Sequence, residues 1–224
     1  MLNSFFSRQK INFSDTLWLS HHIPKTAGTS LRIAFDDAVG RKEVRKVYRP
    51  FEVVSLERGK ITLPRKLPFI IHGHFKPSPE QLAIAPSIKR AVWLRDPVQR
   101  AWSLLKHLID AQNYKNEYEI LNRKFGGRLV DPDPEVLEYF LSNKEFAHLN
   151  RPYQNYFKSV RLHEFDFVGK IENFEGDLSR LGHMMNIKLS SPRVNERRSE
   201  IVIHQKDFMH YLEKEYDVVK DYYE

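Results

Sequence analysis

The sequence contains no cysteine, which excludes disulfide bonds, thiolate nucleophiles and cysteine-ligated metal ions. This absence is compatible with a reducing compartment. No stretch reaches the ~18 consecutive apolar residues that a membrane-spanning helix requires. Taken as a complete chain, the sequence therefore predicts a cytoplasmic protein without an integral membrane segment, although an N-terminal anchor that had been removed would leave no trace in it.

Acidic residues are fewer than basic ones, 29 against 36, and the formal net charge of the 224 residues is +7. A positive balance favours anionic partners such as nucleotides, acidic glycans, nucleic acid or an anionic membrane surface, without choosing among them. The hydrophobic fraction of 41% is ordinary for a globular protein. A chain of this length can bury one core, so we expect a single domain over residues 1–224.

Short apolar runs alternate with amphipathic segments along the chain, which is the pattern of an α/β protein. We predict a three-layer sandwich with a mostly parallel central sheet. Strands are expected at 16–23, 51–56, 69–75, 90–95 and 165–170, and helices at 29–39, 79–85, from Pro97 onward, and at 134–142, 152–159, 172–185 and 204–222. Residues 41–49 are expected to be a basic exposed segment, and residues 113–134 a loop insertion.

The first segment that indicates chemistry lies between the first predicted strand and helix. It consists of Pro24, Lys25, Thr26, Ala27, Gly28, Thr29 and Ser30. A turn of small residues there presents backbone N–H groups at a helix N-terminus and attracts phosphate or sulfate. Because the lysine precedes the glycine, the segment is not a Walker A loop. A turn without function remains an alternative for this segment taken alone.

A second segment joins Arg95, at the end of a predicted strand, to Ser103 in the helix that follows. Open α/β sheets bind ligands at the carboxyl ends of their strands. The guanidinium and the hydroxyl could together hold a phosphate. The plain alternative is that Arg95 pairs with a surface carboxylate and that Ser103 is an ordinary helix residue.

The third segment is His72-Gly73-His74, within a predicted strand. Residues two apart on a strand point to the same face, so both imidazoles are expected to project together. Histidine titrates near pH 6.5, which suits a general base for a hydroxyl group. A metal-binding pair and a structural histidine pair remain alternatives, and no third metal ligand is evident from spacing. For His21 and His22 we expect structural or supporting roles.

Together, the first two segments resemble the sulfotransferases that use 3′-phosphoadenosine 5′-phosphosulfate (PAPS), over roughly residues 15–185. The residues in and around the two segments are most similar to the carbohydrate branch that contains the heparan sulfate 2-O-sulfotransferases. By this resemblance the chain would be a short bacterial or viral member of that branch. The resemblance implies a P-loop-kinase-like sulfotransferase fold. It implies that residues 24–30 bind the 5′-phosphosulfate and that Arg95 and Ser103 bind the 3′-phosphate.

The same resemblance implies the catalytic roles. His74 would be the general base, His72 would assist it by contacting substrate, and Lys25 would stabilise the leaving oxygen. No metal ion is required. Arg197 and Arg198 are further donor contacts suggested by the late basic loop of the family, although this loop lacks the Lys-Gly pair found in many members.

The implied reaction is in-line transfer of the sulfuryl group from PAPS to an acceptor hydroxyl, with a glycan as the favoured acceptor and no role for nucleic acid. Residues 41–49 and 113–134 are expected to frame the acceptor site. A P-loop-type kinase is the alternative enzyme, but it would need a lysine after glycine and acidic magnesium ligands. A non-catalytic nucleotide-binding or nucleic-acid-binding protein is the alternative from another class. The sequence leaves the oligomeric state open.

Overall fold

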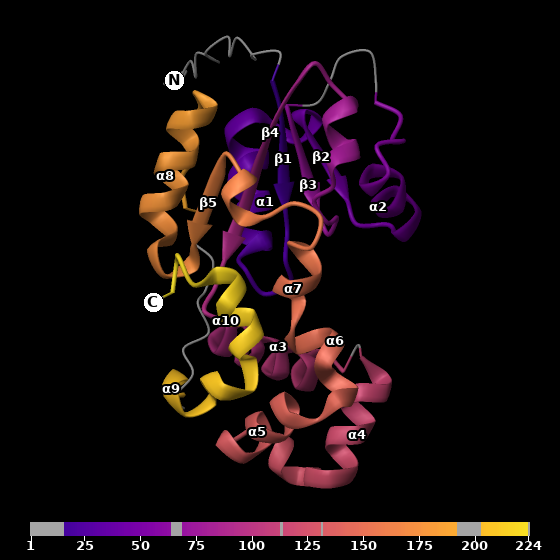
Figure 1. Cartoon of the computed structure of the whole chain (residues 1–224), viewed down its shortest axis with the longest axis vertical. Helices are drawn as coiled ribbons and strands as arrows, with labels where there is room; N and C mark the ends of the chain where they lie inside the picture. The colour runs from indigo at the N-terminus through magenta and orange to yellow at the C-terminus, as the bar shows by residue number, and fades with distance from the viewer. Residues whose placement is uncertain (1–15, 64–68, 113, 131, 192–202, 224) are drawn as a thin grey trace, which may run out of the picture.

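Figure 1 shows the computed structural model of the chain, in which residues 16–63, 69–112, 114–130, 132–191 and 203–223 are described. Its centre is one five-stranded sheet in the order β2-β3-β1-β4-β5. The strands are β1 (Thr16–His21), β2 (Val44–Val47), β3 (Ile70–Gly73), β4 (Ser87–Leu94) and β5 (Phe167–Lys170). Every strand pair is parallel, which confirms the predicted α/β class.

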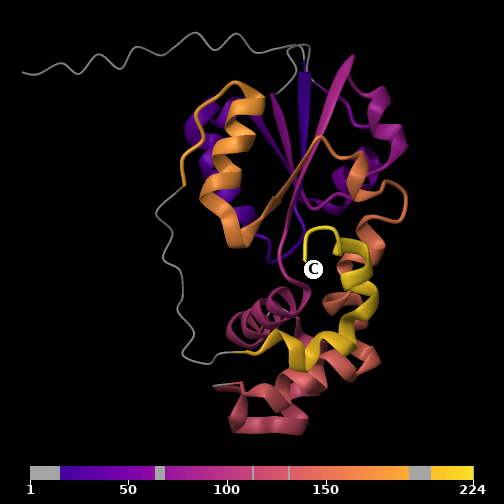
Figure 2. The same cartoon turned by 60° about the vertical axis from the view of Figure 1, so that its left-hand side comes forward.

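Helices cover both faces of the sheet. Helices α1 (Gly28–Val39) and α8 (Phe174–Met185) pack on one face, where Trp18, Phe35 and Leu181 belong to one buried cluster. Figure 2 shows these two helices together, orange and indigo, to the left of the strands. Helix α2 (Pro50–Glu57), the 3₁₀ turn η2 (Pro79–Ala83) and helix α7 (Pro152–Tyr156) lie over the other face. The three-layer prediction is therefore confirmed.

A group of helices lies beyond the carboxyl ends of the strands, toward which the strand arrows point in Figure 1. It comprises α3 (Pro97–Ala111), α4 (Lys115–Phe125), α5 (Pro134–Ser142), α6 (Ala147–Asn150), α9 (Gln205–Phe208) and α10 (Glu213–Val219). The group has its own buried cluster, in which Trp102 and Leu105 of α3 meet Phe140 of α5 and Leu212. This group closes one side of the carboxyl edge of the sheet.

Two predictions for the first third of the chain are wrong. Residues 51–56 form helix α2 rather than a strand, because Pro50 occupies the first helical position and a short apolar run fits either structure. Residues 41–49 are not simply an exposed segment, because they contain strand β2. Val44 and Val47 of that strand are buried, and the strand pairs with β3.

Two predictions for the rest of the chain also fail. Residues 113–134 are not a loop: they contain α4 and the 3₁₀ turn η3 (Gly126–Val130), whose Leu121, Phe125 and Leu129 are buried against α3 and α5. The final segment 204–222 is not one helix but α9, the 3₁₀ turn η7 (Met209–Leu212) and α10. Its predicted apolar face is nevertheless buried.

Candidate active site

The anion-binding loop predicted at residues 24–30 follows β1, at the topological switch point where the strand order reverses. After β1 the chain proceeds to β2 on one side of the sheet, and after β4 it proceeds to β5 on the other side. Strands β1 and β4 are neighbours. Ligands of open α/β sheets bind in the crevice outside the carboxyl ends of two such strands. The loop and Arg95, which follows β4, therefore lie at the expected place for a ligand.

The loop has a constrained backbone. Lys25 and Ala27 both have positive φ angles, 72° and 59°, which non-glycine residues rarely adopt. Between them, buried Thr26 donates its hydroxyl to the carbonyl of Ile23 at 2.8 Å and closes the turn. Ala27 is the N-cap residue of α1 and no side chain caps the helix. The first N–H groups of α1 thus have no intrahelical acceptor and are suited to an anion.

The ring of His22 leaves no space for a side chain at Gly28, the first residue of α1. A Cβ atom at position 28 would collide with the Nε2, Cε1 and Cδ2 atoms of that imidazole. Gly73 is required in a similar way at the end of β3, where a Cβ atom would overlap the carbonyl oxygen of Val47. Gly28 lets the His22 ring lie against the start of α1, and Gly73 lets the end of β3 lie close to Val47 of β2.

His72 is fully buried and both of its ring nitrogens contact protein groups. Its Nδ1 lies 2.9 Å from the Ser20 hydroxyl and its Nε2 lies 3.2 Å from the carbonyl oxygen of Gly28. Because a carbonyl can only accept, Nε2 carries the proton and Nδ1 accepts from Ser20. Burial lowers the pKa of His72 to about 3, so the ring is neutral. His72 therefore ties β3 to the start of α1, and its contacts are with protein groups.

His74 is exposed, in contrast to its neighbour two residues earlier. Its ring lies 4.5 Å from the ring of His22 and 4.8 Å from that of Tyr48, between ring centroids. Partial desolvation by these neighbours lowers the pKa of His74 below the ordinary histidine value. An exposed imidazole whose pKa is lowered has the properties of a general base.

Two residues of this site were missed by the sequence reasoning. Tyr48, directly after β2, places its hydroxyl 3.3 Å from Nδ1 of His22. Arg32, in the second turn of α1, is close enough to His22 and Tyr48 to affect both electrostatically. A strand at 44–47 would have placed Tyr48 at the same sheet edge as His74, and Arg32 follows Gly28 by one helical turn.

Arg95 is held in place through its backbone. The hydroxyl of buried Tyr153 donates to the Arg95 carbonyl at 2.6 Å and accepts from the Arg95 N–H at 3.0 Å. Burial lowers the pKa of Arg95 and the carboxylate of Glu172 acts in the opposite direction. The half-buried guanidinium has no hydrogen bond or ion pair to another described residue, so it can receive an anion. Ser103 lies half-buried on α3, eight positions further along.

The start of α3 is fixed by a second set of contacts. Asp96 caps the helix as predicted, accepting from the N–H of Gln99 at 2.9 Å, and also accepts from the hydroxyl of Tyr216 at 2.7 Å. Glu172 accepts from the Asp96 N–H at 3.0 Å and from the hydroxyl of Tyr223 at 2.7 Å. The C-terminal residues are thereby attached to the same sheet edge as Arg95.

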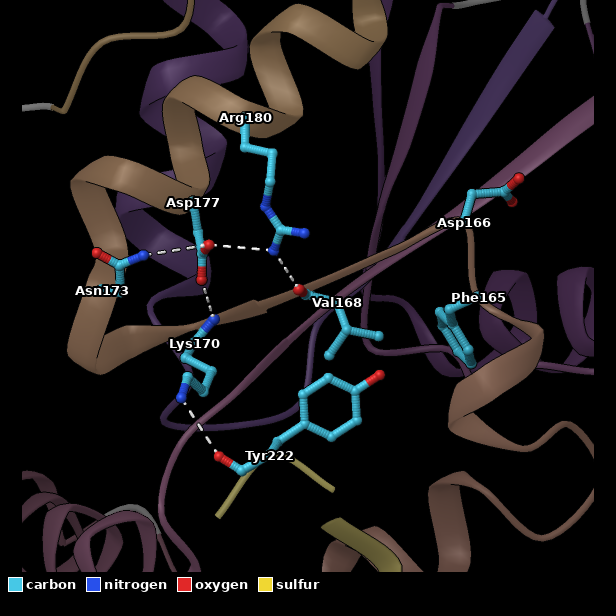
Figure 3. A pocket seen from close by; sticks show the side chains of 8 residues that line it. All are labelled: Phe165, Asp166, Val168, Lys170, Asn173, Asp177, Arg180 and Tyr222. Carbon is cyan, nitrogen blue, oxygen red and sulfur yellow. Dashed lines mark hydrogen bonds and ion pairs between the residues drawn. The ribbon is translucent and has the colours of Figure 1, made fainter. Parts of the chain in front are cut away.

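A separate pocket of about 290 Å³ lies beside β5, between α8 and the C-terminal segment (Figure 3). Its charged groups are satisfied within the protein. Arg180 donates to the Val168 carbonyl and to Asp177, and the N–H of Lys170 donates to the same carboxylate. The Lys170 ammonium donates to the carbonyl of Tyr222. These contacts cover the free edge of β5, and no predicted site residue lines the pocket.

Other predictions fall away from this edge or outside the described residues. His21 is buried and its Nδ1–H donates to the Phe75 carbonyl at 3.0 Å, which fits the structural role expected of it. Arg197 and Arg198 lie within residues 192–202, outside the described part of the chain. Residues 114–130, within the segment expected to frame the acceptor site, pack in the helical group. Among the described residues, no three histidine, aspartate or glutamate side chains gather as a metal site, and no helix has the length and apolarity to cross a membrane.

Comparison with known proteins gives few matches. No protein-family model matches the chain, and no curated protein matches it. Among solved structures, a sulfotransferase from Alicyclobacillus acidocaldarius is similar at 13% sequence identity, with a TM-score of 0.47, over 93% of this chain and 95% of that chain. The roles of the site residues therefore follow from their own geometry.

Proposed function

We propose that this chain is a sulfotransferase that moves the sulfuryl group of PAPS to an acceptor hydroxyl. One observation carries the proposal. The loop at 24–30, His74 and Arg95 follow three neighbouring strands, β1, β3 and β4, and so meet at one edge of the sheet. An anion cradle, a neutral base and an available guanidinium are the groups that this reaction needs.

The chain offers fitting groups for a donor with two anionic ends. The uncapped start of α1, with Lys25, Thr29 and Ser30, would receive the 5′-phosphosulfate. Arg95, whose guanidinium makes no hydrogen bond within the described residues, would receive the 3′-phosphate, with Ser103 as a hydroxyl donor. When bound, PAPS supplies the sulfuryl group and the leaving nucleotide.

The protein groups divide the chemistry between them. His74 accepts the proton of the acceptor hydroxyl as the hydroxyl attacks sulfur. Lys25 stabilises the negative charge that develops on the leaving oxygen, together with the N–H groups of α1. His72, being buried, acts by fixing Gly28 and the loop to β3. Charge stabilisation by the loop and Lys25 requires no metal ion.

The proposed acceptor is a carbohydrate hydroxyl. The His-Gly-His segment is similar to that of the carbohydrate branch, and the net charge of +7 favours acidic glycans. Lys46, Arg32 and Tyr48 lie at the β2 side of the site, where an acceptor would approach His74.

Incubation with ³⁵S-labelled PAPS and a panel of glycans tests the proposal. We expect sulfate transfer by the wild-type chain and a loss of roughly a hundredfold or more in Lys25→Ala, because a leaving-group contact acts only in the transition state. His74→Ala should lose transfer but keep its affinity for 3′-phosphoadenosine 5′-phosphate (PAP). Transfer from ATP with magnesium and none from PAPS would instead support the kinase alternative.

A further inference from the structure

The chain at Gly73 and His74 is hydrogen-bonded through its backbone to the strands on both sides. The N–H of His74 donates to the carbonyl of Val47 at 3.1 Å, which joins the end of β3 to the end of β2. The N–H of His22 donates to the carbonyl of Gly73 at 2.8 Å, which joins the same point to β1. Tyr48, which follows Val47, and His22 itself supply the two rings that contact His74.

The two rings are also attached to one another. The Tyr48 hydroxyl lies 3.3 Å from Nδ1 of His22, and the two ring planes are nearly perpendicular, at 82°. His22 in turn stacks on buried His72, at 5.3 Å and 13° between planes, and abuts Gly28 of the anion loop. A chain of contacts therefore connects His74 to the start of α1.

From this arrangement we propose that His22 and Tyr48 are positioning residues that hold the His74 imidazole in a fixed orientation at the ends of β2 and β3. The inference rests on the proposed function for the role of His74 as base, and it adds two residues that act through His74. Neither ring needs to touch the acceptor or the donor for this role.

The electrostatic surroundings of His22 favour the neutral form of its ring. Burial lowers the pKa of His22 to about 2, and neighbouring His72, His74, Arg32 and Lys25 act in the same direction. Asp36 on α1 is the opposing carboxylate near His72, and it is paired with Lys46 at 2.6 Å. A neutral His22 adds no charge repulsion when His74 takes up a proton during the reaction.

The two rings also exclude water from one side of His74. A ring that is less hydrated loses its proton more readily, so loosening the pair should raise the pKa of His74 toward the ordinary value of about 6.5. This change is measurable without substrate. A residue that only stabilised the fold would leave the titration of His74 unchanged.

The test compares Tyr48→Ala, Tyr48→Phe and the control Tyr139→Phe. Tyr139 is a tyrosine on α5 whose hydroxyl also makes one side-chain hydrogen bond, to Asn143 at 3.0 Å, far from the loop. The measurements are an NMR titration of the His74 ring, steady-state kcat and KM, and the Kd for PAP. Tyr48→Phe keeps the ring and removes only the hydroxyl that lies 3.3 Å from Nδ1 of His22, so it gives a result even if Tyr48→Ala does not fold.

We expect Tyr48→Ala to raise the pKa of His74 and to lower kcat by roughly tenfold or more, since misplacement of a catalytic group is costly. Tyr48→Phe should change both in the same direction by less, and Tyr139→Phe should change neither. The Kd for PAP should stay within about twofold, because these substitutions are expected to affect kcat and not nucleotide binding. An unchanged His74 titration in both Tyr48 variants would overturn the proposal. If wild type transfers no sulfate, the proposed function fails, while the titration still decides whether the rings hold His74.

Discussion

The imidazole of His22 occupies the space that a side chain at Gly28 would need. His22 precedes the 24–30 loop, and Gly28 lies within it as the first residue of α1. Their contact makes the shape of the loop depend on the ring cluster at the ends of β1, β2 and β3. The proposed anion-binding loop and the proposed base are thus connected by one set of packed rings.

Gly28→Ala should therefore impair the site. The added Cβ collides with the His22 ring and must displace it, and overpacking of this kind costs about 1–3 kcal/mol. We expect the Kd for PAP and kcat each to worsen by roughly tenfold. Isothermal titration calorimetry and steady-state kinetics measure these effects.

The control for this change is Gly127→Ala. Gly127 lies in η3, and a Cβ atom added there would have nothing within 4 Å and no positive φ to strain it, so this substitution should leave PAP binding intact. Equal effects in the two variants would show that the contact between His22 and Gly28 is unimportant.

The buried histidines should make the protein sensitive to acid. Burial lowers the pKa of both His21 and His72 to about 3, whereas an unfolded histidine has a pKa near 6.5. Between these values the unfolded state binds more protons, so the free energy of unfolding decreases as the pH falls from about 6.5 toward 3. Each histidine contributes up to about 1.4 kcal/mol per pH unit.

Urea denaturation at several pH values measures this slope. His72→Gln should reduce it, whereas His163→Gln, at an exposed position on the 3₁₀ turn Leu162–Glu164, should not. A slope that is the same in wild type and His72→Gln would mean that His72 takes up protons in the folded protein.

The pH dependence of turnover follows from His74. Its pKa is lowered in the free protein, and a general base must be unprotonated, so kcat/KM should rise with pH along an acidic limb whose midpoint lies below 6.5. The limb should be absent from the residual activity of His74→Ala. A midpoint at or above 7 would be incompatible with the desolvated position of the ring.

Glu172 places a negative charge close to Arg95, the proposed ligand of the 3′-phosphate. Glu172→Gln keeps the shape of the side chain and an acceptor for the N–H of Asp96, but it removes the charge. We expect PAP to bind roughly fivefold more tightly, which corresponds to about 1 kcal/mol. Weaker binding with an unchanged Tm would show that Glu172 contacts the nucleotide directly.

Much of the frame of this site could be predicted from local sequence. The Asp96-Pro97 start of α3, the strand before His74 and the loop after β1 all carry strong local signals, namely a cap, a buried apolar run and a small-residue turn. These signals are sufficient to bring the loop, His74 and Arg95 to one edge once the sheet is parallel.

The remaining features depend on long-range packing. Tyr48 belongs to the site only because β2 pairs with β3, and its own segment is short and basic. The burial of His72 and the exposure of His74 could not be separated by their equal spacing on a strand. The strand ends at Gly73, so the two imidazoles have different environments although they are two residues apart.

Titration of the purified chain with PAP tests whether this sheet edge binds a 3′-phosphorylated adenine nucleotide, as we propose. We expect saturable binding of one PAP per chain, weaker binding of ADP, and a loss of roughly tenfold or more in affinity in Arg95→Ala but not in Arg128→Ala, whose exposed guanidinium is paired with Asp133. Equal affinities for PAP and ADP, unaffected by Arg95→Ala, would contradict this proposal.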